Sequence, residues 1–136
     1  MSGLAEMLRR YIADFNRGDS AAYAACYAPD VVLINGSGRE LRGRDAIVAF
    51  YSEFRGQADR TIELRAVIEG EGVIAAALRS RFVAKVDGVE LGGTSLKAGD
   101  AYELQSMALY ELANGLFRSI RATTIESRVV RQEAQS

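Results

Sequence analysis

The sequence predicts one α+β domain in which a curved antiparallel sheet and the helices that cover it enclose an apolar pocket for a small molecule. Apolar side chains up to Phe54 recur mainly at helical spacing, apolar and polar side chains alternate from Ile62 onward, and glycine-containing turns separate the alternating segments. The 136 residues suffice for one domain, whose folding would bury roughly 68% of the extended-chain surface. We assign residues 1–127 to this domain and residues 128–136 to a polar C-terminal tail.

Three helices are expected ahead of the long strands. The first carries an apolar face and stops at Gly18, and the second stops before Pro29, since the residue preceding a proline favours an extended backbone. The third follows Gly43 and has apolar residues spaced four apart. These signals predict helices at about residues 3–17, 20–27 and 44–54.

Strict alternation predicts most of the sheet. In the segment that begins at Ile74, apolar residues at every second position alternate with positions that include arginine and lysine, as in a strand with one buried side and one side facing solvent. Gly70-Glu71-Gly72 forms the turn that precedes this strand. We expect strands at residues 31–35, 61–68, 74–85, 102–112 and 116–126.

The dipeptide Asn114-Gly115 joins the last two strands as a two-residue hairpin. The register that this turn sets places Leu109 opposite Ile120, and the more apolar of the two resulting faces is expected to point inward. The inward face would also hold Glu103, Gln105, Met107 and Thr124, and the outward face Ser106, Tyr110, Ser119 and Arg121.

The chain contains no histidine, and its one cysteine, Cys26, has no partner for an internal disulfide. The commonest zinc ligand, the Ser-His-Asp triad and the usual base of neutral-pH catalysis are therefore excluded. Any catalytic acid or base must be Asp, Glu, Tyr or Lys. We expect no metal ion and no cofactor.

The charge balance argues against nucleic acid and membrane partners. Lys and Arg number 17 and Asp and Glu 18, a net charge of −1, which provides no field that would gather phosphates or anionic lipids. The longest apolar stretches fall far short of the ~20 residues that span a bilayer. Residues 1–10 lack the apolar region of a secretory signal, so we expect a cytoplasmic protein.

Several sequence motifs occur in a fixed order along the chain. They are Arg10 to Asp19 (RYIADFNRGD), Tyr27 to Val32 (YAPDVV), Gly43 to Ile47 (GRDAI) with Phe50-Tyr51, and the Asn114-Gly115 hairpin. Over about residues 4–127 they resemble the SnoaL-like and ketosteroid isomerase-like branch of the nuclear transport factor 2-like superfamily. The resemblance implies a cone-shaped, curved antiparallel sheet wrapped around three N-terminal helices (a cystatin-like α+β barrel), and a two-fold homodimer formed through the outer face of the sheet.

The resemblance also assigns roles to particular residues. Isomerases of this family enolise a ketone with a carboxylate base on the first strand, opposite a tyrosine and a protonated acid that hold the oxyanion. Tyr11 matches that tyrosine and Tyr51 a supporting tyrosine, but the base position falls on Asn35, whose amide cannot take a proton at neutral pH. The acid position falls near Leu109, which is apolar. Two of the four roles are thus absent, which argues against the usual isomerase mechanism.

Two other activities of the family fit the sequence poorly. Its dehydratases depend on histidine, which the chain lacks. Its epoxide hydrolases require an inward cluster of two acids and an arginine. The predicted alternation instead places three arginines on the outward face, namely Arg79, Arg81 and Arg121.

The residues that the predicted faces turn inward define an apolar pocket with a few hydrogen-bonding groups, suited to a small hydrophobic molecule with a carbonyl or hydroxyl. The catalytic candidates are Tyr11 and Asn35, which would polarise a substrate oxygen, and Glu103, which would move a proton. Partial burial would raise the pKa of Glu103 and suit it to that role. The candidate ligand-binding residues are Tyr51, Phe54, Ser80, Phe82, Gln105, Met107, Ile120 and Thr124.

Three functions therefore stay open. The protein could be an isomerase, cyclase or hydrolase acting on a small hydrophobic molecule, or it could bind such a molecule without turnover. An inward, desolvated Glu103 would favour the enzyme, and a solvated one would favour binding. The third function, an accessory dimerisation domain, would require a pocket filled by its own side chains, namely Phe50, Phe54, Phe82 and Met107.

Overall fold

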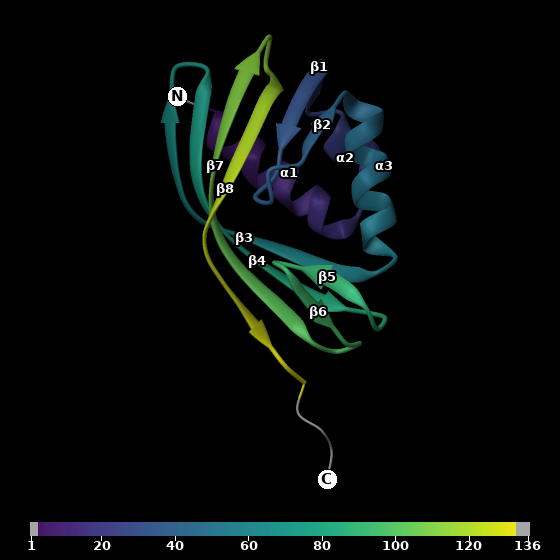
Figure 1. Cartoon of the computed structure of the whole chain (residues 1–136). Coiled ribbons are helices and arrows are strands. Elements are labelled where there is room, and N and C mark those ends of the chain that lie inside the picture. Colours follow the sequence, from purple (N-terminus) through teal and green to yellow (C-terminus); the bar gives the residue numbers. More distant parts are fainter. Residues whose placement is uncertain (1–2, 133–136) are drawn as a thin grey trace.

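In the computed structural model, which describes residues 3–132, three helices lie against the concave side of a strongly curved sheet (Figure 1). The predicted α+β class is confirmed. None of the helices in this range is long and apolar enough to cross a membrane. The elements are α1 (Leu4–Arg17), α2 (Ser20–Ala24), β1 (Tyr27–Ile34), β2 (Glu40–Arg42), α3 (Arg44–Arg55), β3 (Ala58–Gly70), β4 (Val73–Ala84), β5 (Val89–Leu91), β6 (Thr94–Leu96), β7 (Ala101–Ala113) and β8 (Leu116–Val130).

Within the described residues, six strands form one sheet in the order β2-β1-β8-β7-β4-β3, and β5 and β6 form a separate hairpin. Neighbouring strands run antiparallel except β1 and β8, which are parallel, so the sheet is mixed and not wholly antiparallel as predicted. The β5–β6 hairpin lies on the same side of the sheet as the helices (Figure 1). Helices and hairpin together give the molecule its cone shape.

Helix α1 fills the centre of the concave side. Its buried apolar residues Leu8, Tyr11, Ile12 and Phe15 recur at spacings of three and four, which puts them on one face. The helix ends at Gly18, whose φ of 71° is the left-handed conformation that glycine adopts without strain. The predicted end of this helix is confirmed.

Asn16 joins the end of α1 to the edge strand β3. Its Nδ2 donates to the carbonyl of Ile62 at 2.9 Å, and its Oδ1 accepts from the backbone N–H of Ile62 at 2.9 Å. One side-chain amide thus satisfies two backbone groups on the side of β3 that has no neighbouring strand. This bridge holds β3 beside the helix.

An extra residue in β8 changes how this strand pairs with β7. The hairpin turn is as predicted, with Leu112 opposite Phe117, but Glu111 lies opposite Ser119, so Arg118 has no partner in β7. A β-bulge of this kind places two residues of one strand against one of the other. Because side chains alternate between faces, the bulge reverses the inward and outward positions of β8, so that Phe117 before it and Ile120 after it are both buried. The alternation of β7 is unbroken, with the inward positions running from Tyr102 to Leu112.

The predicted inward face of β7 is therefore wrong. Tyr110, not Leu109, lies opposite Ile120 and is buried, whereas Leu109 and Met107 are 41% and 39% exposed on the outer side. On β8, Ile120 is inside as predicted. The β7 residues on the inward face are Tyr102, Leu104, Ser106, Ala108 and Tyr110.

Other segments agree with the prediction to differing degrees. In β4 every second residue from Ile74 to Ala84 is buried, which confirms the predicted alternation. Helix α2 is shorter than predicted, β1 begins at Tyr27, and the short strands β2, β5 and β6 were not predicted. Strand β8 continues to Val130, inside the segment expected to be a tail, and residues 133–136 of that segment lie outside the described residues.

Two apolar clusters stabilise the described part of the chain. The larger lies between α1 and the sheet and includes Tyr11 and Phe117. The smaller lies under the β5–β6 hairpin, where Val89 and Leu96 pack with Phe82 of β4. The hairpin therefore covers the part of the concave side that the helices leave open.

We expect Asn16→Ala to lower the free energy of unfolding by about 1–3 kcal/mol, because it removes two hydrogen bonds and leaves two backbone groups of β3 without a protein partner. Urea denaturation measures the loss. Asn16→Asp should be intermediate, since a carboxylate can still accept from the Ile62 N–H but cannot donate to its carbonyl. An unchanged unfolding free energy for Asn16→Ala would show that the bridge does not hold β3.

Candidate functional site

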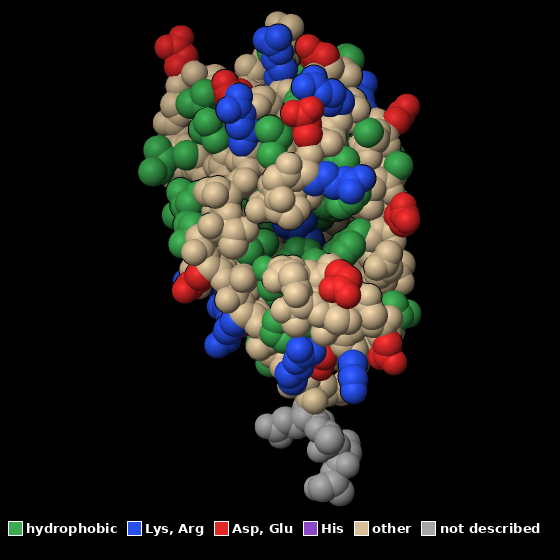
Figure 2. Space-filling view, viewed as in Figure 1, with side chains coloured by type: hydrophobic (Ala, Val, Ile, Leu, Met, Phe, Trp, Pro, Cys, Tyr) green, Lys and Arg blue, Asp and Glu red, His purple; other side chains and the backbone are tan. Residues whose placement is uncertain are grey.

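The concave side contains a cavity bounded by the helices, the sheet and the β5–β6 hairpin. Its outer part has a volume of about 480 Å³ and its inner part about 70 Å³. Figure 2 shows a hollow in the middle of this face, with hydrophobic and basic side chains inside it. The two parts adjoin, because both are lined by Asn35, Gly36, Tyr51, Arg60 and Leu104.

The cavity wall is largely apolar and aromatic. Helix α1 contributes Tyr11 and Phe15 to the inner part, and β7 contributes Tyr110. Among the lining residues that the structure describes, Arg60 and Glu90 are the only charged ones, and Glu90 is exposed on β5. No group of three or more Cys, Asp or Glu side chains in residues 3–132 could hold a metal ion.

Arg60 of β3 lies at the junction of the two parts, with its guanidinium group among aromatic rings. Its Cζ is 4.9 Å from the ring centroid of Phe82, 5.5 Å from that of Phe15 and 5.9 Å from that of Tyr51. Its Nη2 donates to Ser80 Oγ at 3.3 Å. Aromatic faces attract a cation, so these rings offset part of the cost of removing the half-buried Arg60 from water.

No carboxylate compensates the charge of Arg60. Within residues 3–132 none of its nitrogens lies within 4.0 Å of an Asp or Glu oxygen, and its buried Nε has no hydrogen-bond partner. An arginine stays protonated in a protein, so the cavity carries an uncompensated positive charge. An uncompensated charge of this kind lowers the stability of the fold unless an anion binds to it.

Sequence reasoning missed Arg60 because the strand was expected to begin at Thr61. In the structure β3 begins at Ala58, and the alternation that turns Ile62 inward also turns Arg60 inward, two residues earlier. That alternation was the signal that could have found it. The arginines expected on the outer face are exposed, namely Arg79, Arg81 and Arg121.

Tyr11, a predicted catalytic residue, lines the inner part of the cavity. Its Oη and that of Tyr27 are 2.7 Å apart and share a hydrogen bond. Burial, with the neighbouring tyrosines, raises the pKa of Tyr11 well above its usual value, so the hydroxyl stays protonated at neutral pH. Part of its hydrogen-bonding capacity is already used within the core, by a partner that the sequence analysis had put in a helix.

Asn35, the second predicted catalytic residue, lines both parts of the cavity from the end of β1. Its Oδ1 accepts from the backbone N–H of Ser37 at 3.0 Å, from Ser37 Oγ at 2.7 Å and from the backbone N–H of Arg39 at 3.1 Å. The side-chain carbonyl therefore stabilises the turn between β1 and β2. Within the described residues the Nδ2 group makes no hydrogen bond, so it is the half of the amide that could donate to a ligand.

Tyr110 and Ser106 line the inner part of the cavity, although the sequence analysis put them on the outer face. The predicted register paired Leu109 with Ile120, whereas the bulge at Arg118 pairs Tyr110 with Ile120 on the inward face. Burial raises the pKa of Tyr110, while the nearby charge of Arg60 opposes that rise. The Tyr110 hydroxyl makes no hydrogen bond to any residue in the described part of the chain, so it is a protonated donor facing the cavity.

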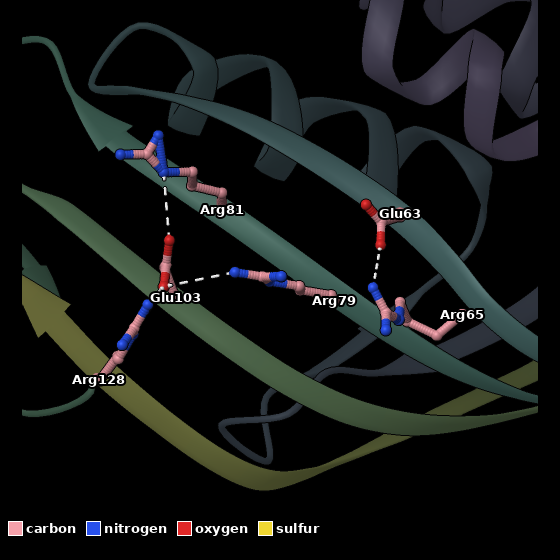
Figure 3. Close-up of polar contacts among 6 residues, drawn as sticks. All are labelled: Glu63, Arg65, Arg79, Arg81, Glu103 and Arg128. Atoms are coloured by element: carbon pink, nitrogen blue, oxygen red, sulfur yellow. Dashed lines mark hydrogen bonds and ion pairs between the residues drawn. The ribbon is translucent and has the colours of Figure 1, made fainter.

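Glu103, the third predicted catalytic residue, lies on the outer face of the sheet. Figure 3 shows it between Arg128, whose Nη2 is 2.6 Å from Oε1, Arg81, whose Nε is 3.4 Å from Oε2, and Arg79, whose Nη2 is 3.8 Å from Oε1. The hydrogen bond from Arg128 is the largest cause that lowers the pKa of Glu103. The prediction of an inward glutamate with a raised pKa is therefore wrong, because Glu103 lies on the side of β7 that faces away from the cavity.

The predicted ligand-binding residues divide into two groups. Gln105 and Met107 lie on the outer side of β7 with Glu103, so their inward placement is wrong. Ser80 is fully buried beneath Arg60 and does not line the cavity itself. The residues that do line it are Tyr51 in both parts, Phe54, Phe82 and Thr124 in the outer part, and Ile120 in the inner part.

Comparisons with known proteins agree on one family and one fold. The family model of the SnoaL-like domain matches residues 8–120. Similar solved structures include a candidate polyketide cyclase from Xanthomonas campestris pv. campestris, with 21% identity, 88% of this chain and 87% of that chain covered, and a TM-score of 0.74. An LEH-like epoxide hydrolase from M. tuberculosis has 9% identity, 86% and 78% coverage, and a TM-score of 0.70.

A protein with a ketosteroid isomerase-like fold from Catenulispora acidiphila, solved in complex with trimethylamine, has 10% identity, 86% of this chain and 83% of that chain covered, and a TM-score of 0.70. Among curated proteins, none matches this chain in sequence. At these identities the structural likeness shows the fold alone.

We expect Glu103→Gln to lower the melting temperature at neutral pH and to matter less below about pH 4. The arginines hold the pKa of Glu103 below its usual value, so its carboxylate stabilises the fold above the ordinary glutamate pKa, and this contribution is lost as the pH falls through the lowered value. Thermal unfolding followed by circular dichroism at both pH values measures the effect.

The matched control is Glu63→Gln, on the same face, whose carboxylate pairs with Arg65 alone within residues 3–132 and is itself well exposed (Figure 3). Its loss at neutral pH should be smaller. A loss for Glu103→Gln that is the same at both pH values would contradict the electrostatic origin.

Proposed function

Because the chain belongs to the SnoaL-like domain family, we propose that its cavity binds a small, largely apolar molecule that carries a carbonyl or hydroxyl group. The observation that carries the proposal is the unfilled volume of about 480 Å³, which Phe50, Phe54 and Phe82 line without filling it. Volumes of ~300–1,000 Å³ with apolar walls and a few polar groups are typical of small-molecule sites. The donors within reach of a ligand oxygen include Arg60 and the Asn35 amide.

Binding without turnover is the form of this proposal that the described residues favour. Asn35 stands where the resemblance assigns the isomerase base, and an amide cannot take a proton at neutral pH. Its Oδ1 is also held by the turn after β1. The β7 side chains that line the inner cavity beyond Leu104 are Ser106, Ala108 and Tyr110, none of them a carboxylate.

An isomerase, cyclase or hydrolase is the second candidate. The observation that favours it is that Arg60 and the protonated Tyr110 hydroxyl line the same inner volume. Two preorganised donors of this kind would stabilise an oxyanion that develops on a substrate. Glu90, the one lining carboxylate among the described residues, would then act as the base through ordered water from the rim of the cavity.

Titration with 2-acetonaphthone, an aromatic ketone, tests the proposal. We expect saturable binding to the wild type, measured by calorimetry and by NMR shifts of residues around the cavity, and an unaltered ketone afterwards. Leu104→Trp should weaken binding at least about tenfold, a change of about 1.4 kcal/mol, because Leu104 lines both parts of the cavity and the larger ring would fill them.

The matched control is Thr61→Trp, which adds the same ring to the exposed outer side of β3 and should leave the affinity unchanged. Equal weakening by the two variants, or no binding to the wild type, would overturn the proposed site. Conversion of the ketone to a new product would favour the enzyme over the binding protein.

We also propose that a second copy of the chain covers the outer face of the sheet. Met107 and Leu109 are 39% and 41% exposed there, and they lie opposite Ala77 and Ala75 of β4, which leaves a low apolar platform. The ion pairs of Glu103 border this platform. An exposed apolar patch with a polar rim is typical of a two-fold interface.

Leu109→Glu should convert a dimer into a monomer, because it places a charge at the centre of the platform. Size-exclusion chromatography with light scattering at micromolar concentration measures the mass of each protein. Ile68→Glu is the matched control, since Ile68 is 70% exposed but lies on the edge strand β3. A monomeric wild type would rule out the dimer.

A further inference from the structure

We propose that the molecule held in the cavity is an organic anion, a carboxylate on a flat apolar body, and that Arg60 binds the carboxylate. The inference rests on the proposed ligand-binding function and names the charge of the ligand. It starts from a cation that the described residues leave without a counter-charge.

Arg60 is half-buried and has fewer partners than its guanidinium can take. A guanidinium removed in part from water is stabilised by an ion pair or by a full set of hydrogen bonds. Arg60 has one hydrogen bond, the long one to Ser80 Oγ at 3.3 Å, and its Nε is buried without an acceptor. An anion that enters the cavity would supply the missing charge.

The surroundings of the guanidinium group restrict where an anion can approach. The rings of Phe82, Phe15 and Tyr51 lie 4.9–5.9 Å from Cζ, and Ser80 takes one proton of Nη2. No described residue accepts from Nη1, and both parts of the cavity reach Arg60. An anion therefore binds at the Nη1 and Nη2 end, where a planar carboxylate can accept two parallel hydrogen bonds.

The other polar groups of the inner cavity favour an anion over a cation or a neutral amide. Tyr110 and Ser106 both carry hydroxyl groups that can donate, and the raised pKa of Tyr110 keeps its proton in place at neutral pH. The inner part has no acidic side chain among its lining residues. Glu90, the one acidic residue that lines the outer part, is exposed on the hairpin. Donors thus converge where the carboxylate would sit.

The two parts of the cavity match the two parts of the proposed ligand, the carboxylate and the apolar body. The inner part, of about 70 Å³, has room for a group of a few atoms, and the outer part, of about 480 Å³, takes the remainder. Aromatic side chains line the outer part, so a flat apolar body would stack against them. These side chains are Phe50, Tyr51, Phe54, Phe82 and Tyr102.

The test compares 2-naphthoate with 2-acetonaphthone, which have the same ring system and differ in charge. At neutral pH we expect the wild type to bind the acid about ten- to a hundredfold more tightly than the ketone, measured by calorimetry. Arg60→Met should weaken binding of the acid far more than binding of the ketone, so that the preference for the acid is lost. Arg60→Lys should keep part of the preference, because it keeps the charge but loses the planar fork.

Arg79→Met is the matched control, because it removes one positive charge from the outer face of β4 and should leave the preference intact. Thermal unfolding checks each variant, and we expect Arg60→Met to melt at or above the wild-type temperature, since it replaces an unpaired, half-buried charge by an apolar side chain.

Three results would overturn the inference. Equal affinities of the wild type for acid and ketone would show that the ligand need not be an anion, and would leave the proposed binding function unaffected. A preference for the acid that survives in folded Arg60→Met would show that another group binds the carboxylate. Binding of neither compound to the wild type would overturn both proposals. The comparison on the wild type alone decides the first and third results, so the test does not depend on whether a variant folds.

Discussion

The bulge at Arg118 is the constraint on which the interior of this protein depends. One unpaired residue in β8 reverses the faces of that strand, so that Phe117 before it and Ile120 after it are both buried. Ile120 thereby lies opposite Tyr110, on the side of β7 that also carries Ser106 and lines the cavity. Glu103, on the other side of β7, joins the arginines of the outer face.

The resulting cavity has an unusual electrostatic composition. Its walls are mainly apolar, burial raises the pKa of the Tyr11 and Tyr110 hydroxyls, and the one charge that is at least partly buried among its described lining residues is the guanidinium of Arg60. The carboxylates that could have neutralised Arg60 lie elsewhere, and Glu103 is itself surrounded by three other arginines. The uncompensated charge of Arg60 lowers the stability of the fold, and binding of an anion would offset that loss.

Much of the fold could be predicted because its signals are local. Gly18 ends a helix, Gly43 precedes one, and the alternation from Ile74 onward identifies a half-buried strand. The bulge at Arg118 could not be predicted, since nothing in the adjacent residues marks it and a bulge shows only in how the two strands pair. As a result, Glu103, Gln105 and Met107 were predicted to line the site, although they lie on the outer face. By contrast, Arg60 could have been found by extending the alternation of β3 two residues toward its start.

The most direct test of the central claim is a crystal structure of the protein in complex with 2-naphthoate. The geometry predicts a carboxylate whose oxygens lie about 2.7–2.9 Å from Nη1 and Nη2 of Arg60, with the naphthalene ring against the aromatic side chains of the outer cavity. A complex in which the acid occupies the outer face of the sheet, or lies in the cavity with its carboxylate turned away from Arg60, would contradict it.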